Sequence, residues 1–132
     1  IKNPTGFNQV IKFLLTVENP AVIALSINDR LADGTDISWL WDVNFEALCE
    51  IQSKVSQFFV SGIRAEDMAV RLKYAGIFTD RITLEKDYGV LLDKALEQLN
   101  AGETLYILPT YTAMLDIRKI LKKRFRLKNF WQ

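Results

Sequence analysis

The hydrophobic pattern of this chain alternates between short apolar runs and longer amphipathic stretches. The run AVIALSI, residues 21–27, is short and apolar, which is typical of a strand buried on both faces of a parallel sheet. Further strands are predicted at residues 39–43, 57–62 and 105–108, with a brief edge strand at 82–84. Apolar residues at helical spacing predict helices over residues 7–17, 45–55, 64–75, 88–100 and 112–123.

The order of these elements indicates the fold class. Strands and helices that alternate with turns of a few residues are typical of an α/β fold with right-handed crossovers. We therefore predict a Rossmann-like three-layer α/β/α sandwich with a mostly parallel sheet, in which residues 21–27 form the central strand. A single domain is expected to cover residues 1–132.

The loops that follow the strands are the first candidates for function, because ligands and partners meet the carboxyl ends of the strands in open α/β sheets. Three such loops are predicted, at residues 28–37, 61–64 and 109–112. The first of them and the segment after it hold four aspartates, which are Asp29, Asp33, Asp36 and Asp42. Aspartate beside glycine is an ordinary turn former, so turns explain two of these side chains. Turn formation does not explain all four.

The composition restricts the chemistry that this chain can carry out alone. Its 132 residues include no histidine, so a catalytic imidazole would have to come from another chain. The single cysteine, Cys49, excludes an internal disulfide and a cysteine-based metal site, and its apolar setting should raise its pKa. Residues 61–68, SGIRAEDM, lack the spacing and the lysine of a P-loop and predict an ordinary helix entry. We expect the isolated chain to hydrolyse neither ATP nor glutamine.

The net charge of +1 hides an uneven distribution. Residues 28–50 are acidic, whereas residues 118–128 hold seven cations and no acid. Cations are favoured at the end of a helix by its dipole, so this tail predicts a solvated helix end and no nucleic-acid partner. No apolar run approaches the ~18 residues of a membrane span. Because the chain begins at Ile1, we expect a cytoplasmic piece of a longer protein.

Two tryptophans precede the last of the four aspartates. In a strand at residues 39–43, Trp39 and Trp41 would share one face and Asp42 would point the other way. Exposed together, the tryptophans would indicate a protein interface, and buried together they would be core. The carboxylate of Asp42 would then face solvent or a partner.

Four stretches of the chain resemble one known family. The runs KNPTGFNQV, NDRLADGTDISWLWDVNFE, SGIRAEDMAVRLKYAGI and LPTYTAML occur in this order and span nearly the whole chain. Together they resemble the C-terminal domain of the MurT family, the Mur-ligase-like subunits of lipid II isoglutaminyl synthase. In the wider Mur ligases this domain swings over ATP, and its first strand often ends in an Asn-Asp pair. Asn28 and Asp29 match that pair, followed here by Arg30 where many of those ligases have a lysine soon afterwards.

The resemblance implies a two-subunit amidotransferase. MurT-like proteins pair with a GatD-like glutaminase, and together they amidate the D-glutamate α-carboxylate of lipid II. The family is thought to supply a carboxylate from this domain to the glutaminase histidine. Asp42 is our first candidate for that carboxylate and Asp36 our second.

The other expected roles follow from the same resemblance. Partner contacts are expected at Trp39, Trp41 and Asp33. ATP, magnesium and a structural zinc are expected in a central domain outside this chain, and no cofactor is expected in the chain itself. The alternative is a Mur-type ligase domain without a glutaminase, in which Asn28, Asp29 and Arg30 approach nucleotide or acyl phosphate.

Overall fold

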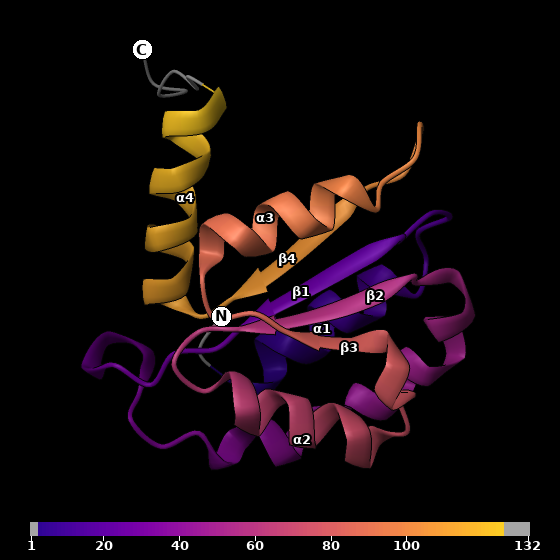
Figure 1. Ribbon diagram of the computed structural model, residues 1–132. Coiled ribbons are helices and arrows are strands. Elements are labelled where there is room, and N and C mark those ends of the chain that lie inside the picture. The colour runs from indigo at the N-terminus through magenta and orange to yellow at the C-terminus, as the bar shows by residue number, and fades with distance from the viewer. Residues whose placement is uncertain (1–2, 126–132) are drawn as a thin grey trace.

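The structure is a computed structural model that describes residues 3–125 and is built around one four-stranded sheet (Figure 1). The strands lie in the order β3-β2-β1-β4, and each neighbouring pair is parallel. Their bounds are Val22–Ser26 for β1, Gln57–Ser61 for β2, Ile82–Leu84 for β3 and Leu105–Pro109 for β4. The predicted parallel α/β sheet is therefore confirmed, with β1 inside the sheet and β3 at its edge. The basic residues Arg126 and Lys128 lie outside the described residues.

Helices cover both faces of the sheet and complete three layers (Figure 1). The α-helices are α1 (Pro4–Leu14), α2 (Ala65–Ala75), α3 (Tyr88–Glu97) and α4 (Tyr111–Phe125). The 3-10 helices are η1 (Leu31–Asp33), η2 (Ser38–Asp42), η3 (Phe45–Lys54) and η4 (Thr79–Arg81). Buried side chains of α1, α2 and η3 pack against one face, whereas α3 packs against the other with α4 beside it.

Strand β1 shows why a continuous apolar run was needed. Ile23 and Leu25 belong to the core beneath α1 and α2, whereas Val22 and Ala24 belong to the core beneath α3. All four side chains are at most 1% exposed. Successive side chains of a strand point to opposite faces, so a strand covered on both sides needs apolar residues at every position.

The prediction of a strand at residues 39–43 is wrong, because this segment forms the 3-10 helix η2. Its start is set by Asp36, whose Oδ1 accepts a hydrogen bond from the Ser38 N–H at 2.9 Å. A 3-10 helix has about three residues per turn, so residues three apart share a face. Leu40 and Val43 have that spacing and are both 1% exposed. Burial of these two side chains therefore favours the helical turn over an extended strand.

The predicted helix at residues 45–55 is also of the 3-10 type, as η3. The first α-helix begins earlier than residue 7, because the Asn3 side chain accepts from the Gly6 N–H at 2.8 Å and Pro4 occupies the first turn. Helix α2 ends as predicted at Gly76, which adopts a left-handed conformation with φ of 102°.

Candidate functional site

The carboxyl ends of β1, β2 and β4 meet at the side chain of Asn28, which is 2% exposed. Its Nδ2 donates to Thr112 Oγ1 at 2.9 Å, and its Oδ1 accepts from the Ile63 N–H at 2.9 Å. Its own N–H donates to Thr110 Oγ1 at 2.9 Å. Asn28 thus joins the loops that follow three strands, and its expected place near nucleotide stays a prediction.

Asp33 is buried in the same network, at 2% exposure. Its Oδ1 accepts from the Thr112 N–H at 2.7 Å, and its Oδ2 accepts from the Thr112 hydroxyl at 2.5 Å and from the Arg30 N–H at 3.2 Å. Thr112 lies in the first turn of α4, where a carboxylate is favoured by the unpaired N–H groups and the helix dipole. The burial of Asp33 does not fit the expected partner contact, because both carboxylate oxygens already bind within the chain.

Replacing Asp33 by asparagine should lower the free energy of unfolding by about 1–3 kcal/mol, because an amide N–H₂ would face the Arg30 N–H or the Thr112 groups. Urea unfolding of the 132-residue chain measures this change. Asp36→Asn is the matched control, since asparagine still accepts from the Ser38 N–H at an exposed site, and its change should stay within about 0.5 kcal/mol. Equal effects of the two substitutions would contradict the capping role of Asp33.

A hollow of about 350 Å³ lies beside this network and is lined by Arg30, Lys86 and Tyr88 among others. Arg30 is exposed, whereas Lys86 Nζ lies 2.9 Å from Glu66 Oε1. Burial raises the pKa of the Tyr88 phenol above its ordinary value, and its hydrogen bond to Asn28 opposes that rise. The arrangement offers cations at the carboxyl ends of the strands, which suits an anionic group.

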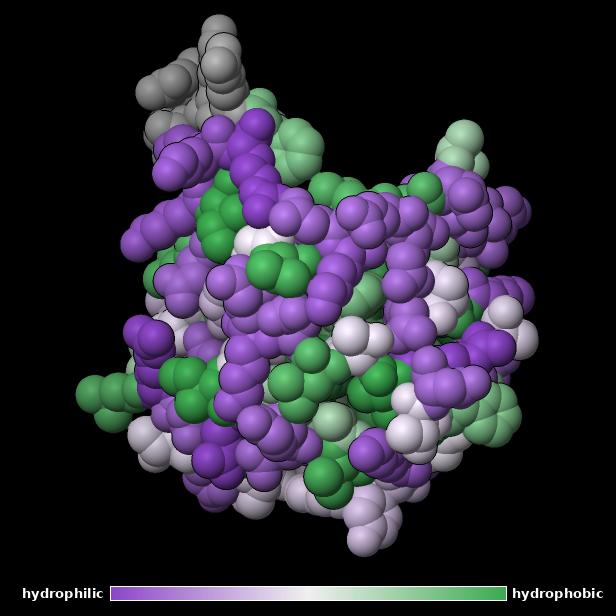
Figure 2. Space-filling model, in the orientation of Figure 1, coloured by the Kyte–Doolittle hydropathy of each residue, from purple (hydrophilic) through white to green (hydrophobic). Residues whose placement is uncertain are grey.

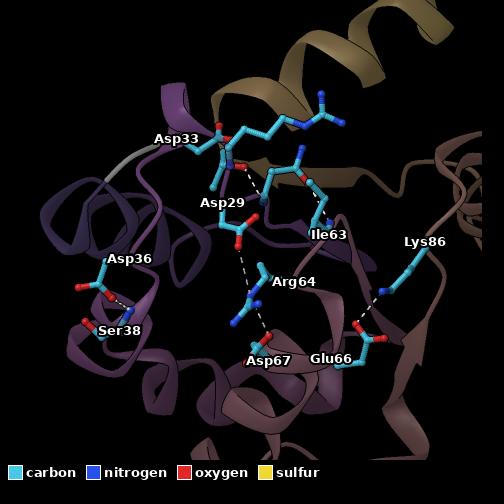
Figure 3. Close-up of polar contacts among 12 residues, drawn as sticks. Asp29, Asp33, Asp36, Ser38, Ile63, Arg64, Glu66, Asp67 and Lys86 are labelled. Carbon is cyan, nitrogen blue, oxygen red and sulfur yellow. Dashed lines mark hydrogen bonds and ion pairs between the residues drawn. The ribbon is translucent and has the colours of Figure 1, made fainter.

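Asp29 points away from that hollow and toward Arg64 of the loop after β2 (Figure 3). Arg64 Nε lies 3.7 Å from Asp29 Oδ2 and 3.0 Å from Asp67 Oδ2. The carboxylate of Asp29 is thus partly neutralised within the chain, and its expected place near nucleotide also stays a prediction.

A second groove, of about 430 Å³, runs between η2 and α2, and we call it the η2–α2 groove. Its lining residues are Asp36, Ile37, Ser38, Leu40, Trp41, Arg64, Glu66, Asp67 and Val70. Trp41 is 52% exposed, and its ring meets the exposed ring of Tyr74 edge to face at 5.4 Å between centroids. The groove therefore combines exposed aromatic surface with carboxylates, as Asp36, Arg64 and Asp67 in Figure 3 illustrate.

The two tryptophans have different environments, which corrects the expectation that they share a face. Trp39 is partly buried and packs on Phe7 of α1, with 5.2 Å between ring centroids. Trp41 projects from η2 beside the η2–α2 groove. The strand argument failed because it assumed alternation, whereas residues two apart in a 3-10 helix point in different directions.

The two candidate carboxylates also differ. Asp36 is exposed, and its hydrogen bond from the Ser38 N–H lowers the pKa of its carboxyl below the ordinary value. Asp42 is exposed at the end of η2, and no hydrogen bond or ion pair joins its side chain to another residue of the range 3–125. Asp42 can therefore give both oxygens to a group outside the chain.

Sequence reasoning missed Arg71, which is only 3% exposed on α2. Its Nε donates to the Leu40 carbonyl at 2.8 Å, and its Nη2 donates to the Val43 carbonyl at 2.7 Å. Nη1 and Nη2 also bind both carboxylate oxygens of Glu46, at 3.0 and 2.9 Å. These hydrogen bonds hold the pKa of Glu46 below its ordinary value. A signal existed, because position 71 falls on the buried stripe of Met68, Leu72 and Ala75.

Cys49 and the remaining surface add no second reactive centre. The Cys49 Sγ donates to the Ala75 carbonyl at 2.8 Å, and burial raises the pKa of the thiol. Among residues 3–125, no group of three or more His, Cys, Asp or Glu side chains could hold a metal ion. No helix within this range is long and apolar enough to cross a membrane. On the face in Figure 2, hydrophobic side chains form small groups between hydrophilic ones.

The sequence matches the MurT ligase C-terminal family over residues 1–114. The chain belongs to this family. Two relatives are 34% identical to it over 124 residues, which is 94% of this chain. Both are named as the MurT subunit of a glutamine-hydrolysing lipid II isoglutaminyl synthase, one from Streptococcus pneumoniae and one from Staphylococcus aureus. Membership confirms the resemblance of the four quoted stretches.

The match covers only part of those MurT proteins. The chain spans 27% of the length of each of these two relatives. The groove, the network around Asn28 and the contacts of Arg71 are therefore properties of the MurT C-terminal domain, whereas the activity of a whole MurT protein is a matter for proposal.

Proposed function

We propose that this chain is the C-terminal domain of the ligase subunit of a lipid II isoglutaminyl synthase. The full-length protein would amidate the D-glutamate α-carboxylate of the peptidoglycan precursor with ATP and with ammonia released from glutamine. The two MurT relatives, whose names specify lipid II and glutamine hydrolysis, support this proposal. ATP, magnesium and a structural zinc would be held by a part of the protein outside this chain, in the cytoplasm.

The specific role proposed for this domain is to dock a GatD-like glutaminase and to complete its active site. The observation that carries the proposal is the exposed, unpaired carboxylate of Asp42 directly after the exposed ring of Trp41. An aspartate that accepts the imidazole N–H fixes the histidine tautomer and stabilises the imidazolium that forms when a cysteine thiol is deprotonated. The absence of histidine from all 132 residues means that the imidazole would belong to the partner.

Trp41 and Tyr74 are the proposed anchor of that interface. Together they expose a pair of aromatic rings beside carboxylates of the η2–α2 groove, including Asp36 and Asp67. Large, rigid aromatic side chains carry much of the binding energy at protein interfaces. Trp39, which packs on Phe7, contributes indirectly by supporting the segment.

Trp41→Ala should weaken binding of the glutaminase by about 2 kcal/mol or more, which is a rise of roughly 30-fold in Kd. The melting temperature should change little because half of the Trp41 side chain is exposed. Titration calorimetry of the full-length protein with its glutaminase, alongside thermal unfolding, measures both quantities.

The matched control is Phe13→Ala. Phe13 is 55% exposed and meets Tyr106 edge to face at 6.1 Å, so it resembles Trp41 in exposure and in its aromatic neighbour. Phe13 lies on α1, away from η2, and its removal should leave Kd unchanged. Unchanged affinity in Trp41→Ala, or an equal loss in both variants, would refute the proposed anchor.

A second candidate function is supported by the hollow near Arg30 and Lys86. In this alternative the domain closes over nucleotide or acyl phosphate, as a Mur-type ligase domain without a glutaminase partner, with Asn28, Asp29 and Arg30 nearest the phosphates. Cations at the carboxyl ends of parallel strands favour such an anionic group. A stable complex between the wild-type protein and a glutaminase would count against this alternative, because it has no such partner.

A further inference from the structure

Arg71 is the most extensively bonded buried cation that the structure places near the proposed interface. Its guanidinium carbon lies 5.1 Å from the centroid of the Trp41 ring and 5.3 Å from that of Phe45. It also reaches two backbone carbonyls and a carboxylate through the contacts already described. Burying a charge is costly unless it is paired and hydrogen-bonded, and here every contact that offsets the cost comes from residues 40–46.

The two carbonyls that Arg71 binds are significant because of what lies between them. They belong to Leu40 and Val43, so the residues enclosed by the contacts are Trp41 and Asp42. Carbonyls at the end of a helix lack partners within the helix, and a planar guanidinium can bind several acceptors in fixed directions. The backbone on both sides of Asp42 is thus tied to α2, although the Asp42 side chain itself remains unpaired.

We propose that Arg71 is a positioning residue for the carboxylate of Asp42. By holding the carbonyls of Leu40 and Val43, it fixes the turn from which Asp42 projects toward the partner's imidazole. This inference rests on the proposed function and adds to it a residue that touches neither the substrate nor the partner. A misplacement of about 1 Å in such a site can cost roughly 10²-fold in rate.

The test compares Arg71→Lys with a matched variant of Arg81. Arg81 Nη1 also donates to two carbonyls three residues apart, those of Gln52 and Val55, but at the far end of η3 from Asp42. Lysine keeps the charge in both variants and loses the planar fork. If Arg71→Lys does not fold, Arg71→Met fills a similar volume without a buried charge and takes its place.

Two measurements on the full-length protein with its glutaminase separate positioning from folding. Arg71→Lys should lower kcat for glutamine-driven amidation by roughly 10²-fold with KM for glutamine unchanged, while the rate with added ammonia stays at the wild-type level. Hydrogen exchange should become faster across residues 38–44 and stay unchanged in β1 and β2. Arg81→Lys should leave the glutamine-driven kcat unchanged.

A double variant decides whether Arg71 acts through Asp42. In the Asp42→Asn background, Arg71→Lys should cause no further loss of the glutamine-driven rate, because a misplaced orienting group and an absent one have the same effect. Losses that multiply, an unchanged hydrogen exchange in residues 38–44, an equal fall of the ammonia-driven rate, or unfolding of both Arg71 variants would overturn the inference. If Asp42→Asn itself has wild-type activity, the proposed function fails instead, and Arg71 is then a residue of the fold alone.

Discussion

Asp42→Asn is expected to remove nearly all glutamine-driven amidation in a full-length protein that carries this domain, while the complex with the glutaminase still forms. Asparagine keeps the shape of the side chain but presents an N–H₂ group where the imidazole N–H needs an acceptor. The same exchange in the serine protease triad lowers kcat by about 10⁴. Asp42 makes no side-chain contact among residues 3–125, so the substitution should not disturb the fold.

Ammonia supplied in the buffer should restore part of the activity of Asp42→Asn. The reason is that the acyl-phosphate chemistry is proposed to lie in another part of the protein, which the substitution does not touch. Glutamine-driven and ammonia-driven amidation should therefore be measured side by side, together with the affinity of the two subunits.

Asp36→Asn serves as the comparison because Asp36 is our second candidate for the same role. Its Oδ1 already accepts the Ser38 N–H, and asparagine can keep that bond. We expect Asp36→Asn to retain glutamine-driven activity. If Asp36→Asn alone is inactive, the mechanism stands with Asp36 as the donor. If both variants show wild-type glutamine turnover, donation of a carboxylate by this domain is wrong.

Gly62→Ala is expected to destabilise the chain by about 3 kcal/mol or more. Gly62 follows β2 with φ of 89°, where a residue with a Cβ is strained by about 1–2 kcal/mol. A Cβ at this position would also lie 2.8 Å from Asn28 Oδ1 and closer still to the backbone oxygen of Ile27. Backbone inside a sheet cannot move aside cheaply, so the clash adds to the strain.

Gly102→Ala separates these two contributions. Gly102 has a similar φ of 83°, but no atom lies within 4 Å of the position that a Cβ would occupy. Its replacement should cost only the conformational strain, about 1 kcal/mol. Urea unfolding of both variants measures the difference, and equal costs would mean that the close approach of β1 and β2 at Gly62 is not limiting.

The general architecture could be predicted from the sequence because it depends on local pattern. The apolar run of β1 indicated burial on both faces, and its alternation with amphipathic stretches indicated a parallel sheet. The loops at the carboxyl ends of the strands then followed from the topology. Asn28 and Thr110 do meet there, joined by a hydrogen bond of 2.9 Å across 82 positions of the chain.

The conformation of residues 38–42 could not be read in the same way. The sequence SWLWD alternates, and aromatic residues favour strands, so the local pattern predicted the wrong element. What favours the 3-10 turn comes partly from elsewhere in the chain. The Arg71 guanidinium on α2 takes up the carbonyls of Leu40 and Val43.

The sequence by itself determined the fold class, the edge of the sheet that carries polar loops, and membership of the MurT C-terminal family. Only the tertiary structure decided which of the four aspartates are engaged and which are free. Asp33 caps α4 from 79 positions away and is buried, whereas Asp42 is exposed and unpaired within residues 3–125. The physical reason is that periodicity reports which face of an element is covered, whereas the partner of a polar side chain depends on contacts between distant segments.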